Sequence, residues 1–140
     1  MTTKDYLGQI KKIDCLINNK LDEIYRLRSL VTSITISSDK ENIKKSSDQD
    51  KLGNAIAKIV DLERETDELI DHFISRRKHI IAQIDAMDNL PFYNVLSLRF
   101  VSGLTIEAIA KKTKYSVDSV KRIQRDAIKA FEKIYGAEYL

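Results

Sequence analysis

The feature that most constrains this chain is an apolar seam that repeats every 3.5 residues along its first 36 positions. Alternate steps of three and four residues pass through eight positions, of which only Lys20 is polar. The apolar positions are Ile10, Ile13, Ile17, Ile24, Leu27, Val31 and Ile34. Residues at this interval keep facing one partner helix, so the seam predicts a long helix of the coiled-coil kind. Glycine occurs only at Gly8 and Gly53 in the first 90 residues, so little interrupts the predicted helices.

A second run with the same spacing extends from Leu52 to Met87. Its positions are apolar except Glu63, Thr66 and Arg77. Between its two ends, the apolar positions are Ile56, Ile59, Ile70, Phe73, Ile80 and Ile84. The three polar residues either set the register and partner choice of the helices, or lie at the solvated edge of a broad bundle.

Residues 37–49, between the two runs, are polar and rich in serine, and they predict a solvated loop. Helices of about 30 and 38 residues would be about 45 and 57 Å long, too long to bury their stripes in a small compact chain. We therefore expect an antiparallel helical hairpin or coiled coil whose remaining apolar surface is covered by a second copy of the chain. The residues expected to mediate this oligomerisation are Ile10, Ile13, Ile17, Ile24, Leu27, Val31, Ile56, Ile59, Ile70, Phe73, Ile80 and Ile84.

The only proline marks the predicted boundary between two regions. Pro91 disfavours helix in Leu90 and suits the first turn of a new helix. We predict an oligomerisation arm over residues 1–89 and a small C-terminal domain over residues 90–140. From residue 91 onward there are nine basic and five acidic side chains, whereas the rest of the chain has 15 basic and 16 acidic ones. The positive surplus therefore belongs to the C-terminal region, which favours a polyanionic partner.

Three short helices are predicted in this C-terminal region, giving an all-α fold. The first covers residues 91–101 and stops at Ser102-Gly103, because glycine readily takes the left-handed conformation that ends helices. Thr105 and Ser116 are suitable N-caps for the second and third helices. On the third helix, the predicted buried positions are Val120, Ile123, Ala127, Phe131 and Ile134. The opposite face carries Asp118, Lys121, Arg122, Arg125 and Lys129.

Two capped helices joined by a short turn, the second with a cationic outer face, form the pattern of a helix-turn-helix. In that motif the second helix enters the major groove of duplex DNA. The capped N-termini at Thr105 and Ser116 also present backbone N–H groups that suit phosphate oxygens.

Residues 98–131 also resemble a known family. The matching elements are Leu98-Arg99-Phe100, Gly103-Leu104-Thr105, Ile109-Ala110, Tyr115-Ser116, and Val120 with Ile123. This segment resembles the C-terminal helix-turn-helix (region four) of bacterial sigma factors, in the version carried by small phage-encoded transcription regulators of the ArpU and RinA type. More loosely, residues 4–14 and 58–71 resemble the helical arm of Gram-positive phage proteins with this tail.

The resemblance implies which side chains face DNA. The family's exposed face maps onto Asp118, Ser119, Lys121, Arg122 and Arg125. Each of the two arginines can hydrogen-bond guanine O6 and N7 or bind a phosphate, and Lys121 and Lys129 suit phosphates. Asp118 either accepts from cytosine N4 or stabilises the helix N-terminus by its charge.

The turn of this chain departs from the family pattern at one position. Where the family usually has glycine, this sequence has Lys114. A residue with a side chain in the left-handed conformation costs about 1 kcal/mol. Either the turn has another geometry or the strain is tolerated.

Other function classes have less support. His72 and His79 lie seven residues apart, but no cysteine or carboxylate spacing completes a metal set, so we expect surface histidines and no metal or cofactor. Cys15 is interpreted as a reduced thiol that fills space beside the seam. No phosphate-binding glycine loop is present, so no enzyme is predicted. Runs without a charge reach ten residues, as in 89–98, too short to span a bilayer, and no secretory signal is evident. A cytoplasmic protein is expected.

These patterns predict a sequence-specific DNA-binding transcription regulator, phage or prophage encoded and acting in late gene control as a homodimer or higher homo-oligomer. One alternative is a DNA-packaging component resembling a small terminase subunit, which a ring of eight or more copies would favour. Another is a helical protein-interaction module with a degenerate helix-turn-helix. Tyr135 and Tyr139 near the C-terminus either pack onto the small domain or contact RNA polymerase.

Overall fold

The structure of this protein is a computed structural model that describes residues 1–41 and 46–140, with side chains described outside 37–49. It contains five α-helices, and the described residues include no strand. The helices are α1 (Thr3–Glu41), α2 (Ser46–Asp85), α3 (Leu90–Leu96), α4 (Ile106–Thr113) and α5 (Val117–Tyr135). A π-helical turn, η1 (Ser97–Val101), continues α3, and a 3₁₀ turn, η2 (Gly136–Glu138), follows α5. The all-α prediction is confirmed.

Much of the segment predicted as a loop, residues 37–49, is helical in the structure. Helix α1 continues to Glu41 and α2 begins at Ser46, while residues 42–45 lie outside the described residues. The polar composition of this stretch suggested a loop, but it contains neither glycine nor proline. Polar residues of this kind are only mildly unfavourable in a helix, so a helix can extend through them.

The chain divides into two compact units, and the division differs from the boundary predicted at residue 90. One unit, here called the two-helix unit, is Leu16–Ile74; the other, the terminal unit, combines Met1–Cys15 with Ser75–Leu140. Residue 90 therefore lies inside the terminal unit. The reason is packing between segments distant in sequence: the ring of Tyr6 on α1 contacts that of Phe131 on α5, with centroids 6.1 Å apart.

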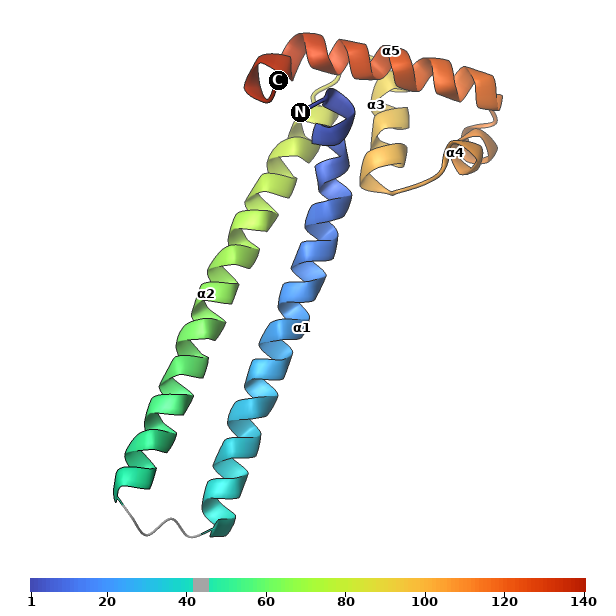
Figure 1. Cartoon of the computed structure of the whole chain (residues 1–140). Helices are drawn as coiled ribbons and strands as arrows, with labels where there is room; N and C mark the ends of the chain where they lie inside the picture. Colours follow the sequence, from blue (N-terminus) through green and yellow to red (C-terminus); the bar gives the residue numbers. More distant parts are fainter. Residues whose placement is uncertain (42–45) are drawn as a thin grey trace. The chain divides into compact units, whose positions relative to one another are not determined.

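In the two-helix unit, the parts of α1 and α2 lie side by side and antiparallel (Figure 1). Ile24, Ile59 and Ile70 from the two seams are buried. Two polar residues of the second seam, Glu63 and Thr66, have ion-pair or hydrogen-bond partners within the chain. Glu63 pairs with Arg28 at 2.8 Å, and the buried Thr66 donates its hydroxyl hydrogen to the Leu62 carbonyl at 2.8 Å.

The residues predicted to mediate oligomerisation are largely inside one chain. Those that are buried are Ile10, Ile13, Ile24, Ile59, Ile70, Ile80 and Ile84. The other five, Ile17, Leu27, Val31, Ile56 and Phe73, are half-buried. A different apolar set is exposed in the two-helix unit: Leu21, Tyr25, Leu30, Ile36, Val60, Leu62, Leu69 and Ile74. Cys15 is also exposed, so its predicted role as a space-filler is wrong.

The terminal unit is built around α5. One core lies between α3, α4 and the first half of α5, where Val95, Leu98, Ile109, Ala110 and Val120 are buried together. Farther along α5, Phe131 is fully buried beside the rings of Tyr6 and Tyr135. Helix α5 therefore holds the small C-terminal helices on one half and the beginning of α1 on the other.

The predicted buried face of α5 needs one correction. Val120, Ala127 and Phe131 are buried and Ile123 is half-buried, but Ile134 is 60% exposed. Gln124 is buried instead. At 100° per residue, the buried residues cover an arc of about 60° with Ala127 and Gln124 at its two edges, and Ile134 falls about 20° outside it.

The turn between α4 and α5 contains a strained residue. Lys114 has φ 64° and ψ 18°, the left-handed conformation, and Gly103 has φ 72°. Of the two explanations for a lysine at this position, the structure shows the second: Lys114 adopts the strained left-handed conformation. Glycine has no Cβ and adopts this conformation without that cost.

We expect Lys114→Gly to be more stable to unfolding than Lys114→Ala by about 0.5–1 kcal/mol, after allowing for the greater freedom of glycine in the unfolded chain. Both variants lose the same charge, so alanine is the matched control. Urea unfolding monitored by circular dichroism measures the difference. Equal midpoints and slopes in the two variants would show that the turn is not strained.

Candidate nucleic-acid interface

The candidate interface consists of α4, the turn after it and the outer face of α5 from Asp118 to Lys129. Both predicted N-caps are confirmed. The Thr105 hydroxyl oxygen accepts from the Ala108 N–H, and that of Ser116 accepts from the Ser119 N–H, each at 3.1 Å. Ser116 also donates its hydroxyl hydrogen to the Ser119 hydroxyl at 2.8 Å, so both serines are engaged in the cap. These bonds fix where the two helices begin.

The predicted outer face of α5 is exposed in the structure. Asp118, Lys121, Arg122, Arg125 and Lys129 are all exposed, and Ser119 is half-buried. The opposite side of the same helix is buried against α3 and α4. Helix α5 therefore presents its cations outward from a fixed support.

The cations of this face differ in whether they are already paired. Arg125 Nε lies 3.7 Å from the Asp126 carboxylate. Lys121, Arg122 and Lys129 take part in no hydrogen bond or ion pair with any residue that the structure describes. Their charges are therefore available to an external anion.

Three further lysines at this place were not assigned by the sequence analysis. Lys111 and Lys112 are in the last turn of α4, and Lys114 follows them in the turn; all three are exposed. Tyr115, beside them, is 45% exposed. The position of these lysines directly before α5 could have assigned them to the same face, but from the sequence they were counted only in the net charge.

Arg99 holds the segment that leads into α4. Its Nη1 donates to the Leu104 carbonyl at 2.9 Å, in the segment that leads to the Thr105 cap. The π-helical turn carries Arg99, and the Ser102 N–H donates to the Ser97 carbonyl at 3.0 Å. The segment resembling the end of the family's first helix therefore also positions the start of α4.

Tyr135 packs onto the small C-terminal domain, as one of the two sequence interpretations proposed, whereas Tyr139 packs on the beginning of α1. Tyr135 contacts Phe131 with ring centroids 4.9 Å apart, and Tyr139 stacks on Tyr6 at 4.1 Å. Burial, with the nearby charge of Glu138, raises the pKa of Tyr6 to about 12, and burial raises the pKa of Tyr139.

This raised pKa predicts a loss of stability in alkali. The folded state favours the neutral phenol of Tyr6, so its contribution is fully present below pH 10, the ordinary tyrosine value, and is lost as the pH rises toward about 12. Urea unfolding at pH 9, 10 and 11 should show a falling free energy of unfolding. Tyr6→Phe should show a shallower fall with pH than the wild type. Identical slopes would contradict the assignment to Tyr6.

The two histidines do not gather metal ligands. His79 Nε2 lies 2.6 Å from Glu138 Oε1, while His72 is exposed. Across residues 1–41 and 46–140, no cluster of three or more histidine, cysteine or acidic side chains could hold a metal ion.

No helix in the described part of the chain combines the length and the apolar character that crossing a membrane requires.

No protein-family model, curated protein or solved structure matches this chain. The interpretation of the interface therefore depends on its residues and on the resemblance described above.

Proposed function

We propose that this protein is a sequence-specific DNA-binding transcription regulator, of the phage-encoded type that its sequence resembles. In this proposal α4 and α5 act as a helix-turn-helix. The observation that carries the proposal is the division of α5 into two faces. Its inner side is anchored by Val120 and Ala127, and its outer side presents Lys121, Arg122 and Lys129 without partners among the described residues.

The major groove of duplex DNA offers hydrogen-bond acceptors and phosphates to these cations. It is about 12 Å wide and admits one α-helix. Arg122, which is unpaired within the described chain, is assigned to guanine O6 and N7, the commonest specific contact of arginine. Arg125 is assigned to a phosphate, because Asp126 already attracts its Nε.

Phosphates on both sides of the groove are assigned to the remaining cations and to the helix ends. Lys121 and Lys129 lie on α5, while Lys111, Lys112 and Lys114 end α4 and enter the turn. The N–H groups at the Thr105 and Ser116 caps add neutral donors aimed at phosphate oxygens. Phosphate contacts set the register of a protein on DNA, and base contacts set its sequence preference.

A homo-oligomer is part of the proposal. One recognition helix reads only a few base pairs, and two helices about one helical turn apart multiply specificity. The exposed apolar side chains of the two-helix unit, such as Leu21, Tyr25, Leu62 and Leu69, are proposed to meet a second copy. The buried seam residues then stabilise each chain internally.

Selection of bound sequences from a pool of random duplex DNA tests the proposed function. We expect an enriched motif with two half-sites about 10 base pairs apart, centre to centre, for a dimer. Arg122→Ala should bind with a relaxed preference at one position of each half-site. A selection that enriches no motif would contradict sequence-specific binding. A mass in solution of eight or more copies would contradict the regulator and favour a packaging component.

A further inference from the structure

The last five residues of the chain, 136–140, turn back onto the terminal unit; we call them the strap. The Gly136 carbonyl accepts from the N–H groups of Tyr139 at 3.2 Å and Leu140 at 2.9 Å. A Cβ at Gly136 would lie 3.0 Å from Leu140 Cδ1 and 3.2 Å from Glu132 Cγ, so a side chain at this position would require these two side chains to shift. The strap is therefore a defined, tightly folded segment.

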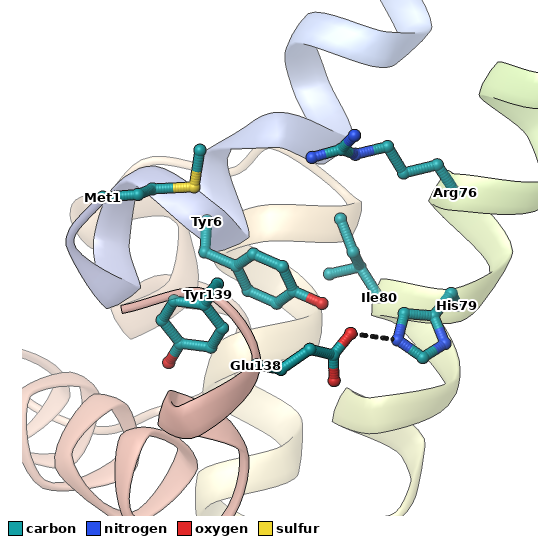
Figure 2. A pocket seen from close by; sticks show the side chains of 7 residues that line it. All are labelled: Met1, Tyr6, Arg76, His79, Ile80, Glu138 and Tyr139. Atoms are coloured by element: carbon teal, nitrogen blue, oxygen red, sulfur yellow. Dashed lines mark hydrogen bonds and ion pairs between the residues drawn. The ribbon is translucent and has the colours of Figure 1, made fainter.

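Two donors on α2 hold the carboxylate of Glu138 in the strap. His79 Nε2 is 2.6 Å from Oε1, and Gln83 Nε2 donates to Oε2 at 2.7 Å. Figure 2 shows Glu138 reaching from the strap toward His79, beside Tyr6 and Tyr139. The hydrogen bond with His79 holds the pKa of Glu138 below its usual range.

Gln83 is held in place by a contact that does not involve the strap. It is 6% exposed, and the Tyr6 hydroxyl donates to its Oε1 at 2.6 Å. That bond identifies the carbonyl end of the amide and leaves Nε2 as the donor to Glu138. The end of α2 thus supplies both donors to the Glu138 carboxylate, and Tyr6 on α1 holds one of them, Gln83, in place.

Tyr139 makes the second attachment of the strap, to the first turns of α1. Its ring stacks on that of Tyr6 with centroids 4.1 Å apart and planes 8° from parallel. Its hydroxyl donates to Thr3 Oγ1 at 2.8 Å, and Thr3 is only 3% exposed.

We propose that the strap is a positioning device: Glu138 and Tyr139 tie α5 to the beginning of α1 and the end of α2, so that these segments move as one body. The device goes beyond the proposed function, because it concerns how α5 is held within the terminal unit. With the strap attached, α5 is fixed to the first turns of α1 and the last turns of α2, all of which belong to that unit.

Hydrogen exchange of the full-length chain, followed by mass spectrometry, tests the strap. We expect exchange in residues 3–15 and 75–85 to rise about tenfold in Tyr139→Ala and about threefold in Glu138→Gln. Glu65→Gln removes the same charge from an exposed position on α2 away from the strap contacts and should leave exchange unchanged. Peptides from residues 95–123, which form the core of α3, α4 and α5, should also remain unchanged in all three variants.

Two results of this experiment would overturn the inference. One is unchanged exchange in residues 3–15 when the strap contacts are removed. The other is an equal rise in residues 95–123, which would mean that the variants destabilise the whole unit. Because this measurement needs no DNA, it tests the positioning role of the strap even if the protein proves not to bind duplex DNA.

Discussion

Replacing Phe131 with alanine is expected to lower the free energy of unfolding by about 3–5 kcal/mol. Phe131 is fully buried, and its ring contacts the rings of Tyr6, Tyr135 and Tyr139. It therefore supports both the beginning of α1 and the strap. Stabilities of whole domains are about 5–15 kcal/mol, so this single change removes a large part of the total.

Ile134→Ala is the matched control for this prediction, because Ile134 lies on the same helix and is 60% exposed. Its expected cost is below about 1 kcal/mol. Urea unfolding monitored by circular dichroism compares the two variants with the wild type. A Phe131→Ala variant that loses no more stability than Ile134→Ala would contradict the shared core.

The second large effect is expected on DNA affinity. Replacing both Arg122 and Arg125 with alanine should weaken binding to a selected duplex by about 100-fold or more, because each well-placed arginine contact contributes about 1–3 kcal/mol. Arg122 has no partner among the residues described, and Arg125 is held only by Asp126 at 3.7 Å. The folded state should therefore lose little when they are removed.

The control for this pair is Lys58→Ala with Lys78→Ala, which removes the same total charge from exposed positions on α2. We expect this control to bind the selected duplex within about threefold of the wild type, since distant surface charges act mainly through the screened overall field. Fluorescence anisotropy at constant salt measures both. Equal affinities for the two double variants would contradict the assignment of the DNA-reading face to α5.

Much of the helical architecture could be predicted from local patterns. The seam spacing indicated two long helices, and Thr105 and Ser116 indicated the starts of α4 and α5, because a cap depends on residues only three positions apart. The outer face of α5 followed from its periodicity in the same way. Lys114 was singled out because the family that the sequence resembles usually has glycine there; the sequence left two explanations open, and the structure gives this residue φ 64°.

The remaining features depend on contacts between distant parts of the chain. The stacking of Tyr139 on Tyr6 and the bonds of Glu138 to His79 and Gln83 join residues between 55 and 133 positions apart. Periodicity contains no information about such pairs, so the boundary at residue 90 was placed inside one compact unit. For the same reason, the seam was assigned to a second copy although much of it is buried within one chain.

Binding of duplex DNA through the cationic face of α5 is tested by the salt dependence of the affinity. Affinity of the wild-type protein for a selected duplex is measured between 50 and 300 mM salt. Lys121, Arg122, Arg125 and Lys129 are exposed on this face. If the three of them that are assigned to phosphates (Lys121, Arg125 and Lys129) act together with Lys111, Lys112 and Lys114, about six phosphates are contacted in each copy. The logarithm of the binding constant should then fall against the logarithm of salt with a slope of about −5 per copy. Binding that does not change with salt, or no binding at 50 mM salt, would contradict the account.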